Sequence, residues 1–382
     1  MQSDKYTILF LSSWYPTRLF PFRGDFVKRH AKAVGLYTKV LCLHVIKDQG
    51  LKRKHEIVEN NSEENLVEVI FYFRSKWLSK LMYLYYYKRG MHYIQKKFGK
   101  PDLIHGNVLY PVGSIVFILS VLYKIPYIFT EHWTGFLNGT YQRINLFKRF
   151  LYNYIGRKAR KVIPVTANLK QAMMVSGVHG KYAVIPNVVE TEVFQTQSNP
   201  DEHKKSILHV SNIRDEHKNI SGLLRSISKL RLMRQDFVLN IINSEENEAL
   251  IEISDSLGLT GKYVNFCGKK EYAEVAQFMA KSAFLVLFSN YENLPCVIVE
   301  AFAAGLPVLS TDVGGIKEHL DKEKGILIKK GNEEQLVDKL NFMLDHYQDY
   351  DKQLLANYAY ENFSLEKVGF KYQKIYQEVL NV

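Results

Sequence analysis

Short apolar segments alternate along this chain with longer amphipathic ones, and no other feature constrains the fold as strongly. The short segments have the length and composition of buried strands. The longer ones carry helical periodicity, as at 25–34 and 145–158. Strands that alternate with helices are typical of βαβ units, in which the strands lie parallel in one sheet. The sequence therefore predicts an α/β protein built on parallel sheets.

The strand-like segments form two series, with a junction at 184–194. The expected strands are 6–12, 39–46, 67–73, 101–105, 126–130 and 161–167 in the first series, and 206–212, 237–243, 263–268, 283–289, 306–311 and 325–330 in the second. A chain of 382 residues is also long enough for two domains. We expect two doubly wound domains. Ligands of open α/β sheets lie beyond the carboxyl ends of the strands, so the cleft between the domains is the expected site.

The composition excludes several classes of protein. The chain is 47% hydrophobic and 24% charged, which is a globular balance. Its three cysteines are widely separated, so neither a disulfide framework nor a zinc site is indicated, and a reducing compartment is expected. The first residues lack the features of a signal peptide. The longest other apolar run, 113–129, is interrupted by Lys124 and Pro126 and falls short of the roughly 20 residues that span a bilayer. These features predict a cytoplasmic protein without a transmembrane segment.

The formal net charge of +12 attracts polyanions such as nucleic acid, anionic membrane or nucleotides. No known nucleic-acid-binding motif is evident, so nucleic acid is not an expected partner. The segment 74–98 mixes aromatic side chains with lysine and arginine. It is either a helix that packs its aromatic residues on the first sheet or an interfacial helix that contacts an anionic membrane. Both readings can hold at once.

Two glutamates, Glu292 and Glu300, stand in an otherwise apolar segment, because Glu300 is the only charged residue in 293–311. Pro295 fits the first turn of a helix, and Gly305 fits its end. The start of a helix offers N–H groups that suit an anion or sugar hydroxyls. A buried carboxylate needs partners, and a diol can donate two hydrogen bonds to it. The alternative is that Glu300 lies on the exposed face of an amphipathic helix.

The spacing of these glutamates, followed by "AFAAGLPVLSTDVGG", resembles the E-x7-E signature of retaining glycosyltransferases with the GT-B fold. The resemblance is greatest to glycosyltransferase family 4, the glycosyl transferases group 1 family. Further segments resemble that family in the same order and extend the resemblance over nearly the whole chain. They lie at 12–34, 102–113, 127–133, 184–194 and 208–224.

This resemblance implies two Rossmann-like domains that face each other across a cleft. Residues 1–188 would form an acceptor-binding domain, to which a C-terminal helix, 364–382, returns. Residues 189–363 would form a domain that binds a nucleotide-sugar donor. Gly268 and Lys269 fall where the family recognises the base of the nucleotide.

The resemblance also assigns roles around the two glutamates. Glu300 would bind the ribose hydroxyls of the donor, and Glu292 would contact the donor sugar as a catalytic residue. Backbone N–H groups that hold the sugar or the diphosphate would come from Asn293, Leu294 and Cys296.

Lys218 matches the family lysine that binds the donor diphosphate. The family usually has an arginine about six positions earlier, but Asn212 stands there in this chain. Either the nearby Arg214 contacts the diphosphate from a shifted place, or Lys218 acts with less help.

In the first domain, the resemblance singles out Gly24 and His132. Gly24 would let the backbone approach the donor phosphates closely. The alternative is an ordinary helix start with Asp25 as the N-cap. His132 would face the reaction centre and donate a hydrogen bond to a sugar hydroxyl or to developing negative charge. His105 is a candidate neighbour of that histidine.

The implied mechanism is front-face transfer with retention, without a protein nucleophile, a cofactor or a metal ion. Catalysis would come from positioning and from charge stabilisation. One D-x-D triplet, Asp349 to Asp351, resembles the metal motif of the other glycosyltransferase fold. Its polar surroundings favour an exposed surface segment instead.

The resemblance therefore implies a hexosyltransferase that uses a nucleotide sugar, with UDP favoured over GDP because UDP is the commonest nucleotide in the family. The acceptor would be a glycan or a lipid-linked sugar at the inner face of the cell membrane, in bacterial cell-surface polysaccharide synthesis. Two alternatives remain open at this stage. One is a UDP-sugar epimerase of the same architecture, and the other is a non-catalytic partner subunit, for which Asn212 gives slight support.

Overall fold

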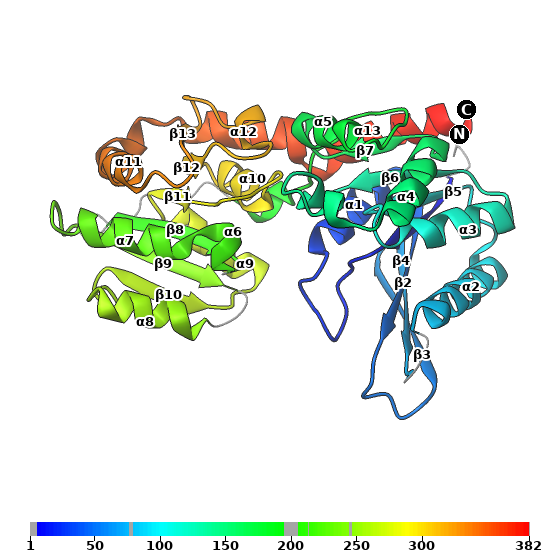
Figure 1. Cartoon of the computed structure of the whole chain (residues 1–382). Helices are drawn as coiled ribbons and strands as arrows, with labels where there is room; N and C mark the ends of the chain where they lie inside the picture. Colours follow the sequence, from blue (N-terminus) through cyan, green and yellow to red (C-terminus); the bar gives the residue numbers. More distant parts are fainter. Residues whose placement is uncertain (1–5, 76–78, 195–204, 213, 244–246, 382) are drawn as a thin grey trace. The chain divides into compact units, whose positions relative to one another are not determined.

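The computed structural model describes residues 6–75, 79–194, 205–212, 214–243 and 247–381. The chain divides into two compact units. Unit 1 comprises residues 1–188 and 365–382, and unit 2 comprises residues 189–364. Figure 1 labels most of their helices and strands.

Unit 1 is built on a seven-stranded sheet with the order β3-β4-β2-β1-β5-β6-β7. The strands are β1 (Thr7–Ser12), β2 (Lys39–Lys47), β3 (His55–Glu63), β4 (Leu66–Phe73), β5 (Leu103–Asn107), β6 (Tyr127–Glu131) and β7 (Val162–Pro164). All neighbours are parallel except β3, which pairs antiparallel with β4. The six strands expected in the first series are all present. The sequence prediction missed β3, because this edge strand is largely polar and has no apolar run.

Helices cover both faces of this sheet. They are α1 (Asp25–Gly35), α2 (Ser79–Phe98), α3 (Gly113–Tyr123), α4 (Leu146–Lys158), α5 (Ala167–Val175) and α13 (Leu365–Leu380), with short 3-10 turns η1 (Thr134–Phe136) and η2 (Tyr141–Arg143). Alternate residues of β1 enter two different cores. Leu9 and Leu11 pack with α2, α3 and α4, whereas Ile8 and Phe10 pack with α1 and α13. This two-sided burial explains why the strands are almost continuously apolar.

The basic and aromatic segment 74–98 forms α2 from Ser79 onward. Tyr86, Tyr87 and Met91 are buried in the core beside the sheet, while Lys88 and Arg89 are exposed. The reading in which the aromatic residues pack on the first sheet is therefore confirmed. Contact of this helix with a membrane stays a prediction. Among the described residues, no helix combines the length and apolar character needed to span a bilayer.

Unit 2 is built on a six-stranded parallel sheet with the order β10-β9-β8-β11-β12-β13. The strands are β8 (Lys205–Ser211), β9 (Phe237–Asn243), β10 (Val264–Gly268), β11 (Phe284–Leu287), β12 (Val308–Thr311) and β13 (Gly325–Ile328). All six were expected. The helices are α6 (Asp215–Lys218), α7 (Ile220–Leu230), α8 (Glu248–Ser256), α9 (Tyr272–Ala280), α10 (Cys296–Ala303), α11 (Glu333–His346) and α12 (Lys352–Phe363), with η3 (Thr191–Val193), η4 (Ile316–Glu318) and η5 (Tyr347–Asp349). The prediction of a doubly wound α/β architecture is confirmed.

The C-terminal helix α13 packs against α1 within unit 1. Gly369 makes this close approach feasible, because a Cβ atom there would lie 2.1 Å from the carbonyl oxygen of Ala33. The Tyr37 hydroxyl donates a hydrogen bond to the Glu366 carbonyl at 3.1 Å. A chain segment far away in sequence therefore completes one face of unit 1.

Replacement of Gly369 by alanine should loosen α13 from α1, because overpacking of this kind costs about 1–3 kcal/mol. Gly35 provides the matched control, because a Cβ atom there would meet nothing within 4 Å. Gly35→Ala should leave stability unchanged or raise it by about 0.4–1 kcal/mol. Urea unfolding followed by tryptophan fluorescence would measure both changes, since Trp14 and Trp133 lie in unit 1 and the sequence of unit 2, residues 189–364, contains no tryptophan. Equal midpoints for the two variants would contradict the close packing.

Candidate functional site

In unit 2, the structure brings Lys218 and Glu292 together. Lys218 ends the short helix α6 after β8, and Glu292 lies in the connection from β11 to α10. Because β8 and β11 are neighbours in the sheet, the loops at their carboxyl ends meet. Lys218 Nζ lies 2.5 Å from Glu292 Oε1, and both side chains are largely buried. This is also where the strand order reverses direction, which is the usual ligand position in an open α/β sheet.

Glu292 is held in place by its surroundings and is only 8% exposed. The Ser289 hydroxyl donates a hydrogen bond of 2.7 Å to the same Oε1 that pairs with Lys218. Gly314 packs against the backbone of Glu292, where a Cβ atom would lie 2.0 Å from the carbonyl oxygen. The N–H of Gly315 donates to the Asn293 carbonyl at 2.9 Å. The glycine pair after the E-x7-E segment therefore shapes the loop that carries Glu292, a role that sequence reasoning missed.

The loop after β8 is tied to the loop after β11 by backbone contacts. The N–H of Asn290 donates to the His217 carbonyl at 2.7 Å. Arg214 is the N-cap of α6, its side chain is exposed, and its carbonyl accepts from the N–H of Lys218 at 2.9 Å. Asn212, which stands where the family has arginine, is exposed as well. The structure thus places Arg214 one helical turn before Lys218.

Glu300 lies in the second turn of α10 and is only 6% exposed. The alternative of an exposed amphipathic face is therefore wrong for this residue. The helix begins at Cys296, and Pro295 is its N-cap rather than part of the first turn. Gly305 follows the helix end with a left-handed φ of 70°, which confirms the predicted termination.

The remaining donor-site candidates of unit 2 occupy two separate places. Asn293 and Leu294 are buried directly before the N-cap of α10, and Cys296 is half-buried as the first helical residue. Gly268 ends β10 with a left-handed φ of 65°, and Lys269 beside it is exposed. Because β9 separates β10 from β8, the structure does not bring this pair next to Lys218.

In unit 1, Gly24 precedes α1 as its N-cap and has a φ of 77°. A Cβ atom there would lie 2.4 Å from the carbonyl carbon and oxygen of Trp14. Backbone conformation and crowding therefore both require glycine at this position. The alternative of Asp25 as the N-cap is wrong, because Asp25 is already helical and forms an i,i+4 ion pair with Arg29, 3.0 Å from Oδ2 to Nε.

His132 follows β6 directly and is buried. Its Nδ1 lies 3.1 Å from Oδ1 of Asn187. An amide oxygen only accepts, so Nδ1 carries the hydrogen and donates it. The ring packs against Phe26 and His30, with centroids 4.5 and 5.0 Å away. Burial, and secondarily the neighbouring His30, hold the pKa of His132 well below its usual value. His132 is therefore a neutral imidazole at pH 7.

Sequence reasoning missed Glu131, the residue that positions the loop around His132. One carboxylate oxygen accepts the N–H of His132 at 3.0 Å and that of Trp133 at 2.9 Å. The other accepts the N–H of Leu109 at 2.8 Å, from the connection after β5. Burial raises the pKa of Glu131 to about 7, although the three N–H groups act in the opposite direction. The signal in the sequence is a carboxylate at the end of an apolar strand, one residue before the candidate histidine.

His105 is also buried, but both of its ring nitrogens contact structural groups. Nδ1 lies 2.7 Å from the Tyr376 hydroxyl of α13, and Nε2 lies 2.7 Å from Oγ1 of Thr130 in β6. The Thr130 oxygen is in turn 2.8 Å from the Tyr372 hydroxyl. His105 therefore anchors α13 to the sheet of unit 1.

The D-x-D triplet has a local structural role. Asp351 is the N-cap of α12 and accepts the N–H groups of Gln353 and Leu354 at 2.8 and 3.0 Å. Asp349 is exposed and lies 2.9 Å from Nδ1 of His346. Among the residues that the structure describes, no three His, Cys, Asp or Glu side chains form a group that could hold a metal ion.

Two family models match the chain. "Glycosyl transferases group 1" matches residues 190–361, and "Glycosyltransferase Family 4" matches residues 43–193. An uncharacterized glycosyltransferase of Methanocaldococcus jannaschii is 26% identical over 335 residues, covering 85% of this chain and 90% of the relative. A putative teichuronic acid biosynthesis glycosyltransferase of Bacillus subtilis is 24% identical over 350 residues, covering 87% and 88%.

Solved structures share the fold of the whole chain. Sucrose-phosphate synthase from Thermosynechococcus elongatus superposes with a TM-score of 0.78 and 16% identity, covering 99% of this chain and 100% of the other. HepE of Anabaena, solved in complex with UDP and glucose, superposes with a TM-score of 0.73 and 16% identity, covering 98% and 100%.

The buried histidines of unit 1 should make it sensitive to acid. Burial lowers the pKa of His30 to about 4, whereas an unfolded histidine titrates near 6.5. The stability that comes from keeping His30 neutral is fully present above about pH 6.5. It is lost as the pH falls from the unfolded pKa of about 6.5 toward the folded pKa of about 4. Between about pH 7.5 and about pH 5, the urea midpoint followed by tryptophan fluorescence should fall. His30→Gln should show a smaller fall, whereas substitution of the exposed His92 by glutamine should not change it.

Proposed function

The chain belongs to glycosyltransferase family 4 and has the GT-B fold, and on this basis we propose that it transfers a hexose from a nucleotide-diphosphate sugar to a hydroxyl of an acceptor. UDP is the favoured nucleotide, with GDP as the alternative. The observation that carries the proposal is the buried Lys218–Glu292 pair. Glu292 lies in the loop that leads into α10, and α10 carries the buried Glu300.

The donor is proposed to bind at the carboxyl ends of β8 and β11. The ammonium group of Lys218 binds the diphosphate. The carboxylate of Glu292, which accepts a hydrogen bond from this group, holds it in position. The carboxylate of Glu300 accepts hydrogen bonds from the two ribose hydroxyls, which suit a buried acceptor with two oxygens. Glu292 contacts the donor sugar, and Arg214 is the further cation for the phosphates. Gly24 allows a close backbone approach to them.

The reaction exchanges one bond for another. The bond between C1 of the sugar and the diphosphate oxygen breaks, and C1 forms a bond to the acceptor oxygen on the same face. The hydroxyl proton passes to the leaving diphosphate, so the products are the glycosylated acceptor and the nucleoside diphosphate. Lys218 stabilises the charge that develops on the leaving group. Because the single N–H of neutral His132 lies on Nδ1 and donates to Asn187, its Nε2 serves as an acceptor for a sugar hydroxyl rather than as the donor expected from the sequence, and no metal ion takes part.

The acceptor is proposed to bind to unit 1 and to be a glycan or a lipid-linked sugar. The Bacillus relative named for teichuronic acid biosynthesis supports a setting in bacterial cell-surface polysaccharide synthesis. We place the enzyme in the cytoplasm, at the inner face of the membrane. The exposed basic residues of α2, such as Lys88 and Arg89, support contact with anionic lipid.

Thermal unfolding with UDP, GDP and ADP, with and without EDTA, would identify the donor class. A ligand at 100 times its dissociation constant adds about 2.7 kcal/mol to stability. One nucleotide should raise the melting temperature independently of EDTA. Glu300→Ala should abolish this shift, whereas Glu334→Ala, at an exposed site on α11, should retain it. The absence of a shift with every nucleotide would contradict the proposal, and consumption of a nucleotide sugar without acceptor would indicate an epimerase.

The Lys218–Glu292 pair can be separated into structural and binding contributions. Lys218→Met should lower the free energy of unfolding by about 1–3 kcal/mol, because it leaves Glu292 buried without its cation. Adding Glu292→Gln should recover much of that loss, because it removes the buried charge. The nucleotide-induced rise in melting temperature should be absent from Lys218→Met and also from the double variant. Its return would exclude Lys218 as the diphosphate ligand.

A further inference from the structure

Unit 1 contains a pocket of about 650 Å³, and none of the residues that line it is assigned to the donor above. It lies beyond the carboxyl ends of β1 and β2, where Ser12, Ser13 and His44 line it. Helices α2, α3 and α4 and the connections after β1 and β5 also contribute to its wall. Trp14, whose backbone packs on Gly24, also lines the pocket. The pocket thus occupies the ligand position of an open α/β sheet and adjoins the connection that precedes α1.

Most of the helical wall of this pocket is apolar. Tyr87 of α2, Ile115 and Ile118 of α3, and Leu151 and Tyr152 of α4 all line it. A sugar chain needs hydrogen-bonding partners for each hydroxyl that it buries, and the isoleucine and leucine side chains offer none. A cavity of this size with mostly apolar walls suits a hydrocarbon chain instead.

The charged residues that line the pocket are all positively charged. Arg23 and Lys148 line it, and none of the described residues lining it is an aspartate or a glutamate. His44 is buried there, and burial lowers its pKa to about 4, so it adds no charge at pH 7. Two cations beside an apolar cavity are complementary to a ligand that joins a hydrocarbon chain to an anionic group.

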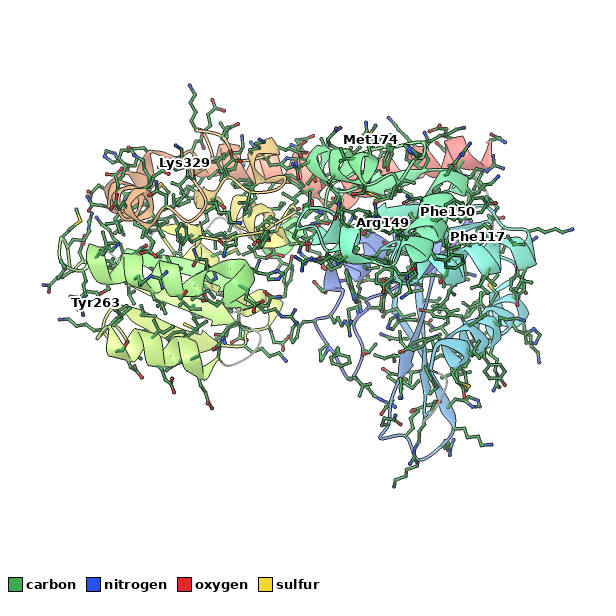
Figure 2. All side chains as sticks on the ribbon, in the orientation of Figure 1. Phe117, Arg149, Phe150, Met174, Tyr263 and Lys329 are labelled. Carbon is green, nitrogen blue, oxygen red and sulfur yellow. The ribbon has the colours of Figure 1, made fainter. Side chains whose placement is uncertain are left out.

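The same helix α4 presents a second apolar surface to solvent. Leu146, Phe147 and Phe150 are 76%, 74% and 72% exposed. Arg149 lies between them in sequence, and Figure 2 labels Arg149 and Phe150 on α4. Exposed aromatic and aliphatic side chains among basic ones are typical of helices that lie in a membrane interface. We call Leu146, Phe147 and Phe150 the α4 patch.

Helix α4 carries both features, on different sides of its axis, because successive residues of a helix are turned by about 100°. Lys148, Leu151 and Tyr152 line the pocket, while the α4 patch comes from the neighbouring positions of the same two turns. If the α4 patch rests on an anionic bilayer, a ligand anchored in that bilayer has to pass this helix to reach the pocket.

We propose that the acceptor is an anionic amphiphile, a sugar linked through phosphate to an isoprenyl or alkyl chain, whose sugar carries the accepting hydroxyl and which is drawn from an anionic bilayer. Its hydrocarbon chain occupies the pocket of unit 1, its phosphate pairs with Arg23 and Lys148, and the α4 patch rests on the bilayer. This assignment depends on the proposed function, whose acceptor it specifies.

The pocket can be tested with dodecyl phosphate, by isothermal titration at concentrations below micelle formation. Ile118→Trp fills the pocket and should weaken binding about tenfold or more. Val121→Trp, about one turn further along α3 at a site that is 61% exposed, is the matched control and should bind as wild type does. Lys148→Glu should weaken the binding of dodecyl phosphate but not of dodecyl maltoside. Lys158→Glu, at an exposed position of α4, should change neither.

The bilayer source is tested by sedimentation with vesicles of phosphatidylglycerol or of phosphatidylcholine. The protein should sediment with the anionic vesicles at low salt and be released by high salt. The double variant Phe147→Ser, Phe150→Ser should lose this binding. The control is Leu232→Ser, Met233→Ser, which removes apolar side chains that are 82% and 62% exposed in unit 2 and should sediment as before.

The nucleotide-induced melting shift, measured on every variant, separates this inference from the proposed function. If the shift persists while Ile118→Trp binds dodecyl phosphate as tightly as Val121→Trp does, the pocket assignment is overturned and the proposed function stands. If dodecyl phosphate binds in the pocket but the protein ignores anionic vesicles, the bilayer source is overturned. If no nucleotide raises the melting temperature of the wild type, the proposed function is overturned, and the acceptor assignment that rests on it is overturned with it.

Discussion

The ion pair between Lys218 and Glu292 depends on one property of parallel sheets, which is that their strands all end at the same edge. The two residues are 74 positions apart in sequence, yet β8 and β11 are neighbours and their following loops meet. The rest of the candidate donor site is arranged around this pair. Ser289 binds the same carboxylate oxygen, Gly314 packs under the Glu292 backbone, and α10 begins four residues later and buries Glu300.

Unit 1 uses buried hydrogen bonds where unit 2 uses an ion pair. Glu131 joins the connections after β5 and β6 through three backbone N–H groups, and so sets the backbone of His132. His105 joins the same strands to α13 through two hydroxyl groups. Because these groups are deeply buried, their protonation is shifted toward the neutral forms, and the candidate catalytic histidine is held as a neutral imidazole. The returning helix α13 is therefore part of what positions this edge of the unit 1 sheet.

The two units offer different chemistry to their ligands. Unit 2 presents a cation and two carboxylates, which suit the charged and hydroxylated parts of a nucleotide sugar. Unit 1 presents a largely apolar pocket with Arg23 and Lys148 in its wall, next to the exposed apolar residues of α4. This contrast is the reason for assigning the amphiphilic substrate to unit 1, because a hydrocarbon chain gains free energy only where it leaves water.

The sequence by itself determined which segments are strands and helices, because apolar periodicity is local and every expected strand carries it. It also identified Glu292 and Glu300 as candidates through residue type and spacing, and Lys218 through the resemblance to the family. It missed β3, whose edge position lets it be polar. It also placed the start of α10 one residue early and left the N-cap of α1 open, since capping depends on local dihedral angles. Tertiary structure alone decided that Lys218 and Glu292 form a pair, that Glu131 holds the His132 loop and that an apolar pocket exists beside α4. Each of these is a contact between segments far apart in the chain, and the order of strands in the sheet, which local patterns do not encode, sets which segments meet.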